Sequence, residues 1–339
     1  MKKILTCFIF LPLVLACERT VNLPVAPSER ILTLNSIICT GDSLHTAFVA
    51  WSSFDNCYMI EDASLRCYVN GILQSETSDL TGHEAPQSIR FKCRARPGDM
   101  VRLELETPDG NLAVAEVKAP FPAVINNVDT AFVTMLRPSD RYPQACRQFL
   151  ATMEDRTGED NFYRVQIFSE AARVLAVKGE YERHEPGDTL AYYGRKELAV
   201  INTLEPSLNS GIRIPREDDG TTVYDPDYFE NTFNIFRDTR FSGSAYTLNL
   251  ACEDRFYNRS GGYMDDSSYI CRARAVVRLN TMDKDAYSYL NAVQYCSSTL
   301  AEFSVGTPLI FKQNVSGGTG FVTVMSSFDY IIDLPDMQL

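Results

Sequence analysis

Histidine is scarce in this sequence, which contains only His45, His83 and His184. No two of them lie at the spacing by which a helix or a strand presents two side chains to one metal ion. The sequence therefore excludes a zinc site built on histidine. It also offers few groups that change charge near neutral pH, which limits the acid–base chemistry that the protein can perform.

Basic residues are also in short supply, with 32 lysines and arginines against 44 aspartates and glutamates. The formal net charge is −12 at pH 7. A protein that binds nucleic acid needs a basic face for the phosphates, so we expect no nucleic-acid partner. The acidic residues are spread along the chain, which favours a role in solubility over an acidic binding tail.

Long apolar runs are absent after the first residues, and no later segment approaches membrane-spanning length. The chain begins with Lys2 and Lys3, followed by the uncharged apolar stretch from Ile4 to Leu15. A membrane-spanning helix needs about 20 apolar residues, and this stretch has only about a dozen. The pattern is typical of a signal peptide, which we expect to occupy residues 1–16 and to be removed.

The expected signal peptide ends in Val14-Leu15-Ala16-Cys17, which resembles the bacterial lipobox. The resemblance implies a diacylglycerol thioether and an acylated amino group on Cys17, with chains such as palmitate. More than one acyl chain is needed for stable anchoring, so Cys17 would hold the protein on a membrane and residues 17–27 would form a lipidated tether. The mature chain would carry 30 basic and 44 acidic side chains, a net charge of −14. The alternative is a soluble secreted protein with a chance cysteine.

Cysteines are plentiful by contrast, and eight of the ten remain once Cys7 and Cys17 are set aside. An even number in an exported protein suggests disulfides. The pair that we favour is Cys67 with Cys93, since both lie on the apolar side of alternating strands and would bridge two facing sheets. The alternative is that several are buried thiols, and no pair has the two-residue spacing of zinc ligands. The eight candidates are Cys39, Cys57, Cys67, Cys93, Cys146, Cys252, Cys271 and Cys296.

Alternation of apolar and polar residues dominates the first part of the chain, most clearly at residues 89–94 and 101–106. This is the period of a strand that has one buried face. Turn-forming pairs such as Asn70-Gly71 separate the alternating runs. About seven short strands follow one another at regular spacing, which predicts an immunoglobulin-like β-sandwich over residues 28–119.

A larger β-rich domain is predicted over residues 123–339, because a chain of this length usually forms more than one core. Its strand-like runs are residues 147–153, 161–168, 246–252 and 269–280. The fold class is therefore mainly β.

One amphipathic helix is predicted near the C-terminus, at about residues 283–298. Asp283 can cap its first turn. Apolar residues recur after it at the spacing of one helical face, namely Ala286, Tyr289, Leu290, Val293 and Cys296. We expect this helix to pack on the protein and not to recognise a partner.

Residues 205–231 contain three prolines and several acids, and they indicate a long irregular excursion. Loops of that length are usually functional or mobile. Oxygen ligands there suit calcium, but carboxylates near turns more often cap or solvate the loop. We therefore predict no metal and name only weak calcium candidates, which are Asp218, Asp219, Asp225 and Asp227.

The run Gly41-Asp42-Ser43-Leu44 spells the signature of a family of serine lipases and esterases. Resemblance to that family implies a helix after the serine and a histidine late in the chain. No histidine follows residue 184, and no aspartate stands three residues before His83 or His184. We expect instead a hairpin tip that joins residues 31–39 to residues 44–51, without catalysis.

Gly317, Gly318 and Gly320 invite comparison with a phosphate-binding loop. Such a loop needs a helix directly after the glycines and a lysine followed by serine or threonine. The residues that follow, Phe321-Val322-Thr323-Val324, are typical of a strand. We predict a glycine turn between two strands, because the positive dihedrals that glycine allows explain the pattern without a ligand.

The run from Asn314 to Phe321, placed after a tyrosine-bearing helix, resembles the end of the domain-of-unknown-function family 4249. That family comprises uncharacterised outer-membrane lipoproteins of the Bacteroidetes, often encoded beside TonB-dependent receptors. The lipobox and residues 31–35, 241–248 and 287–290 fit the same order and spacing. The chain departs from the family in having more cysteines. It also keeps only Glu18 of the acidic run that directs such proteins to the surface, which leaves the leaflet open.

Two functions from different classes follow. The first is a non-enzymatic accessory or ligand-capture partner of a TonB-dependent β-barrel receptor, which rests on the expected anchor, the β-rich domains and the family. The second is a structural or adhesive surface lipoprotein, fimbrial or glycan-contacting, because sandwich domains host many functions. We expect no cofactor, and the ligand is left open among small molecules, peptides and glycans. Trp51, Tyr224, Tyr228 and Tyr263 are candidates for a sugar or peptide surface, although core packing is their usual role.

Overall fold

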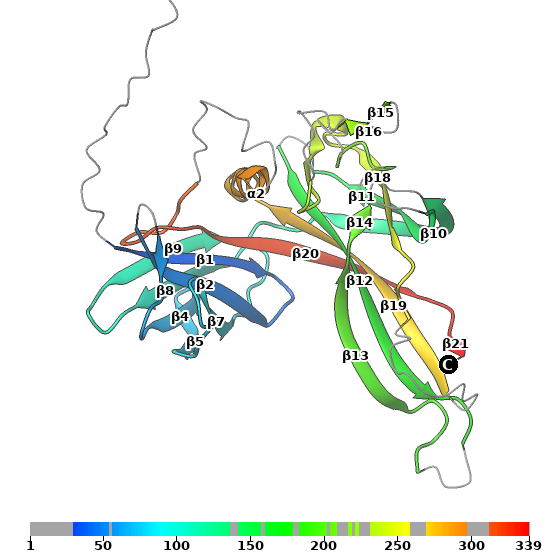
Figure 1. Cartoon of the computed structure of the whole chain (residues 1–339), viewed down its shortest axis with the longest axis horizontal. Coiled ribbons are helices and arrows are strands. Elements are labelled where there is room, and N and C mark those ends of the chain that lie inside the picture. The colour runs from blue at the N-terminus through cyan, green and yellow to red at the C-terminus, as the bar shows by residue number, and fades with distance from the viewer. Residues whose placement is uncertain are drawn as a thin grey trace, which may run out of the picture.

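The chain folds mainly into β-strands, arranged as two parts that share one long sheet (Figure 1). The structure is a computed structural model. It describes residues 30–53, 56–135, 142–156, 160–178, 183–201, 204–208, 216–218, 221–223, 231–257, 269–296 and 312–338. The expected signal peptide and the tether with Cys17 lie outside these residues, so both stay predictions.

The first nine strands form a sandwich of two sheets. They are β1 (Ile31–Cys39), β2 (Leu44–Ser52), β3 (Cys57–Tyr58), β4 (Ser64–Val69), β5 (Ile72–Thr77), β6 (Leu80–Thr81), β7 (Gln87–Lys92), β8 (Met100–Glu106) and β9 (Leu112–Lys118). One sheet has the order β1-β2-β7-β6 and the other has the order β5-β4-β8-β9. In immunoglobulin nomenclature these are strands A, B, E and D facing C′, C, F and G. The predicted immunoglobulin-like sandwich is confirmed.

The core of the sandwich lies between its two sheets, as the alternation predicts. Ile89 and Phe91 are buried on β7, while Arg90 and Lys92 are exposed. The same core contains the inward residues of the facing sheet, Leu103 among them. Each strand thus buries one face, and the hydrophobic effect holds the two sheets together.

The second part contains the longer strands and the helix. They are β10 (Val124–Met135), β11 (Gln144–Glu154), β12 (Phe162–Leu175), β13 (Thr189–Leu198), β14 (Val200–Ile201), β15 (Arg216–Asp218), β16 (Thr221–Val223), β17 (Ile235–Arg237), η3 (Asp238–Arg240), β18 (Ala245–Glu253), β19 (Tyr269–Met282), α2 (Lys284–Cys296), β20 (Val322–Asp333) and β21 (Met337–Gln338). All four predicted strand-like runs of this part fall on β11, β12, β18 and β19 and are confirmed. A separate four-stranded sheet has the order β10-β11-β18-β14.

Strand β20 joins the two parts. It pairs antiparallel with β19 and parallel with β1, where Ser36 lies opposite Val322 and Cys39 lies opposite Met325. The long sheet therefore continues from β13 through β20 into the sandwich, as Figure 1 shows. The division of the chain at residues 119–123 stays a prediction, and the sheet crosses it.

The glycine segment before β20 lies against both sheets of the sandwich. The amide of Thr319 donates to the carbonyl of Leu32 on β1 over 2.8 Å, and Ser316 exchanges backbone hydrogen bonds with Val114 on β9. A Cβ atom at Gly318 would lie 2.4 Å from the Leu32 oxygen. Glycine is thus required for close backbone approach, a role beyond the turn that the sequence indicated.

Helix α2 has the predicted cap at its first turn and packs on the protein through one face. The carboxylate of Asp283 accepts a hydrogen bond from the Ala286 amide at 2.6 Å, which is the predicted cap. The buried residues are Ala286, Leu290 and Gln294. The predicted placement of Cys296 on the buried face is wrong, because the helix ends at Cys296 and the side chain is exposed there.

Candidate functional site

The run Gly41-Asp42-Ser43-Leu44, which resembles the esterase signature, links the two parts of the protein through an ion pair. The Asp42 carboxylate accepts hydrogen bonds from Nη1 and Nη2 of Arg278 at 2.9 and 3.2 Å. The other edge of the same guanidinium donates to Asp329 from Nε and Nη2, at 2.6 and 2.9 Å. The predicted hairpin is confirmed, since β1 and β2 flank Asp42 and Ser43. Asp42 is thus engaged in an ion-pair network that orients no nucleophile.

His45, the histidine nearest to Ser43, is buried beneath the same hairpin. Its Nε2 lies 3.2 Å from the carbonyl oxygen of Cys93, so the neutral ring donates there. Burial lowers the pKa of His45 below its ordinary value, despite that hydrogen bond and the nearby Asp42. The histidine is a neutral structural donor.

We expect stability to fall as the pH drops below about 6.5, where the unfolded His45 binds a proton that the folded ring resists. Urea midpoints measured between pH 7.5 and 5.5 report this loss. A His45→Gln variant keeps an amide donor without the titration, so its midpoint should vary less with pH. The matched control is His83→Gln, because His83 is exposed. Equal pH slopes for the wild type and the His45→Gln variant would contradict the assignment.

The structure brings one of the candidate cysteine pairs together. The Cys67 and Cys93 side chains lie together in the core between the two sheets of the sandwich, and the interaction with Cys93 and burial raise the pKa of the Cys67 thiol. Both are thiols in the structure, which contains no disulfide among the residues that it describes. Cys146 and Cys252 are near in register but lie on opposite faces of their sheet, since Cys252 belongs to the main core and Cys146 to a separate cluster.

We expect Cys67 and Cys93 to form a disulfide in an oxidising buffer, because the two side chains lie together in the core of the sandwich and a disulfide needs cysteines that are close in the folded protein. Mass spectrometry of a non-reduced digest should find one peptide pair that carries both cysteines. The matched control is Cys57→Ser, since Cys57 is exposed and its loss should leave the cross-link in place. Absence of the cross-link after oxidation of the wild type would refute the pairing.

Several predicted site residues have no described geometry. Asp219, Asp225 and Asp227 lie outside the described residues, and Asp218 is described only as backbone of β15. Among the residues that the structure describes, no group of three histidine, cysteine, aspartate or glutamate side chains is placed to hold a metal ion. The three candidate tyrosines also lie outside the described residues, whereas Trp51 packs against the sandwich core.

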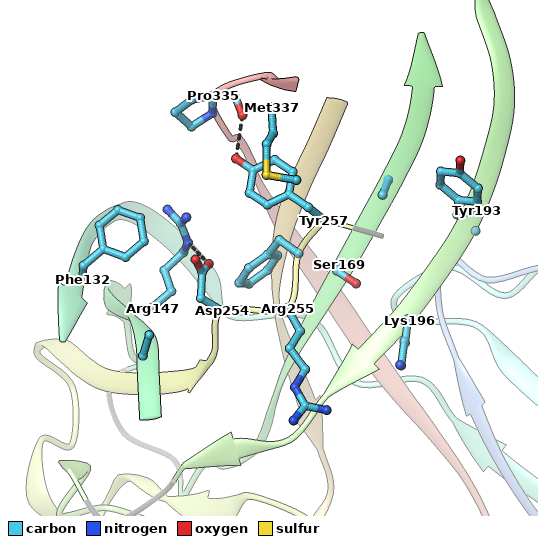
Figure 2. Close-up of a pocket in the computed structure, with 14 residues that line it drawn as sticks. Phe132, Arg147, Ser169, Tyr193, Lys196, Asp254, Arg255, Tyr257, Pro335 and Met337 are labelled. Atoms are coloured by element: carbon cyan, nitrogen blue, oxygen red, sulfur yellow. Dashed lines mark hydrogen bonds and ion pairs between the residues drawn. The ribbon is translucent and has the colours of Figure 1, made fainter. Parts of the chain in front are cut away.

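A cleft of about 930 Å³ opens between the four-stranded sheet and the outer strands of the long sheet. Figure 2 shows Phe132 and Arg147 on one wall and Ser169, Tyr193 and Lys196 on the other. Strands β10 and β11 supply the first wall, and β12 and β13 supply the second. The segments after β18 and after β20 complete the lining. A cavity of this size is typical of a small-molecule site.

Arg147 is the most constrained side chain of the cleft. Arg147 as a whole is only 5% exposed, and its Nε donates a hydrogen bond to Oδ1 of Asp254 at 3.0 Å. The guanidinium carbon lies 4.3 Å from the ring centre of Phe132 and 5.5 Å from that of Phe256. Two aromatic rings and one carboxylate thus fix the plane of the cation.

The remaining lining of the cleft combines solvent-exposed aromatic rings with hydroxyl groups. Phe132 is 70% exposed and Tyr193 is 39% exposed. Burial raises the pKa of Tyr257, whose protonated hydroxyl donates to the Pro335 carbonyl at 2.6 Å. These groups can bind and orient a ligand.

Arg147 was not predicted as a site residue, although the sequence contains a signal for it. On β11 it shares the buried face with Phe149, Ala151 and Met153. An arginine at an inward position of an alternating strand needs a partner or a ligand. The partner Asp254 lies 107 residues later, so only the folded register reveals the pair.

Among the residues that the structure describes, no helix is both long and apolar enough to cross a membrane. The model of one protein family, described as Domain of unknown function (DUF4249), matches residues 18–331. A search of curated proteins gave no match.

Two alpha-2-macroglobulins are among the similar solved structures. The trypsin-activated protein from Escherichia coli is 8% identical over 78% of this chain and 15% of that chain, with a TM-score of 0.22. A Salmonella variant is 10% identical over 93% of this chain and 15% of that chain, with a TM-score of 0.21. The chain thus spans 15% of the length of each. At these TM-scores the likeness carries no argument about fold or function.

Proposed function

Since the chain belongs to the family of the domain of unknown function DUF4249, we propose that it is a non-enzymatic lipoprotein that captures a ligand for a TonB-dependent receptor. It would be anchored in the outer membrane of one of the Bacteroidetes through acyl chains on Cys17. The observation that carries this proposal is the cleft between the two sheets, which contains the constrained side chain of Arg147 and exposed aromatic rings.

The chemistry of the described site residues favours binding over catalysis. Asp42 is engaged with Arg278, and His45 donates to a backbone carbonyl. The cleft contains cations and aromatic rings on rigid strands, an arrangement that suits recognition because little has to be ordered on binding. A capture protein needs no more than such a site and a tether that keeps it beside the receptor.

Co-purification from the native host tests the partnership. Gentle detergent extraction of the anchored protein should bring a β-barrel receptor with it, identified by mass spectrometry. A Cys17→Ser variant should leave the membrane on a carbonate wash and lose the receptor, because the acyl chains are absent. If no β-barrel accompanies the anchored wild type, the proposal fails. A loss of adhesion in a deletion strain that keeps normal uptake would favour the structural or adhesive function.

A further inference from the structure

The outer edge of the Arg147 guanidinium is a donor pair without an acceptor from the protein. Asp254 accepts from Nε alone. Among the residues that the structure describes, nothing accepts from Nη1 or Nη2, and Figure 2 shows both atoms on the side away from Asp254. The side chain is only 6% exposed, yet neither Nη atom is among the fully buried polar atoms that lack a partner, so these donors open onto the cleft, where a ligand can accept from them.

Two parallel N–H groups of one guanidinium match the two oxygens of a carboxylate. Phe132 and Phe256 already fix the plane of the Arg147 group, so the bidentate geometry is formed before a ligand arrives. Asp254 offsets the charge of Arg147 and Glu253 forms an ion pair with Arg255, whereas Lys196 leaves the described lining with one positive charge in excess. A single negative charge on the ligand is what this balance accommodates.

The rings beside Arg147 define the rest of the ligand. Phe132 covers the guanidinium with one face, yet 70% of the residue is exposed, and Tyr193 stands open on the opposite wall. Exposed aromatic faces in a cleft bind flat or ring-shaped groups. We propose that the cleft binds a small carboxylate that carries a ring, with its carboxylate on Nη1 and Nη2 of Arg147 and its ring against Phe132. This inference rests on the proposed ligand-capture function and names its ligand class.

Matched charged and neutral probes test the inference by calorimetric titration of the full mature protein. The first pair is 4-methylumbelliferyl glucuronide and the corresponding glucoside, and the second pair is N-benzoylglycine and its amide. We expect the charged member of at least one pair to bind about tenfold more tightly or better. Preference for the glucuronide indicates an acidic sugar as the source of the carboxylate, and preference for N-benzoylglycine indicates a peptide end.

Variants test whether Arg147 causes the tighter binding of the charged probes. Arg147→Met should remove the difference between charged and neutral probes, and Arg147→Lys should weaken the charged probe about tenfold, because an ammonium lacks the planar fork. The matched control is Arg274→Met, since Arg274 lies on exposed β19 surface and pairs with Asp333 outside the cleft. If Arg147→Met does not fold, Phe132→Ala replaces it, and this variant should weaken the charged probe at least threefold.

Three results would overturn the inference. They are equal binding of charged and neutral members by the wild type, an undiminished preference in Arg147→Met or, if that variant does not fold, unchanged affinity for the charged probe in both Arg147→Lys and Phe132→Ala, and displacement of the charged probes by equimolar inorganic phosphate. Equal and measurable binding of both members would be compatible with ligand capture but would exclude a carboxylate as the recognised group. The receptor partnership fails separately, through the co-purification result.

Discussion

A Gly318→Ala variant is expected to lose about 3 kcal/mol of unfolding free energy or more, because the added methyl group overpacks a closed site. The new Cβ would lie 2.4 Å from the Leu32 oxygen and 2.9 Å from the Cβ of Ala113. Leu32 belongs to one sheet of the sandwich and Ala113 to the other, and both are buried in the shared core. Neither strand can retreat alone. Urea unfolding followed by the fluorescence of Trp51, the single tryptophan, measures the change in midpoint.

The control for this variant is Gly110→Ala. Gly110 has a φ of +83°, and a Cβ atom added there would meet nothing within 4 Å, so alanine suffers only backbone strain. That strain costs about 1–2 kcal/mol. Equal losses in the two variants would show that close approach to β1 and β9 is not what fixes glycine at residue 318.

An Arg278→Met variant is expected to lose about 3 kcal/mol, the lower end of the cost of breaking a buried ion pair. The arginine side chain is 7% exposed, and its removal leaves Asp329 at 25% exposure without its strongest donor. The lower end applies because Asp42 is 40% exposed and water can replace the arginine there. Chemical unfolding should show the loss in midpoint without a change in slope.

The matched control is Arg274→Met, on the same face of the same strand. Its partner Asp333 is 75% exposed, and pairs of that kind contribute about 0–1 kcal/mol. A loss at Arg278 no larger than at Arg274 would contradict a central role for the network. It would show that the bridge that Arg278 forms between Asp42 and Asp329 contributes little to the free energy of unfolding.

The same network predicts a response to acid. Burial opposes the charge of Asp329, but hydrogen bonds from Arg278 and Arg195 outweigh it and lower the pKa of the carboxyl. The stabilisation is therefore complete above the unfolded pKa of about 4 and is lost as the pH falls through the folded pKa. In the Arg278→Met variant this part of the acid response should shrink.

The sandwich could be predicted from the sequence because its information is local. Each strand carries its own alternation, and turn residues such as Asn70-Gly71 mark where a strand ends. The cap of the helix at Asp283 is equally local. Burial of Cys296 was predicted wrongly because periodicity continues to the last turn of a helix even where no neighbour covers it.

The cleft and the joining strand could not be predicted, because they depend on partners far apart along the chain. Arg147 meets Asp254 only through the pairing of β11 with β18. Alternation in residues 322–333 indicates a strand but does not say that it pairs with β1, nearly the whole chain length away. Periodicity fixes which side of a strand is buried and leaves its neighbour undetermined.

The parallel pairing of β1 with β20 has a consequence for biogenesis. During synthesis Ile38 leaves the ribosome long before Val324, its partner in the sheet. Until β20 has been synthesised, the edge of β1 that it will cover has backbone amides and carbonyls without hydrogen-bond partners. Another extended polypeptide segment can pair with this edge. Maturation can therefore finish only after translation does. Chains that terminate before residue 322 should be the ones that misassemble with each other or depend on a holdase.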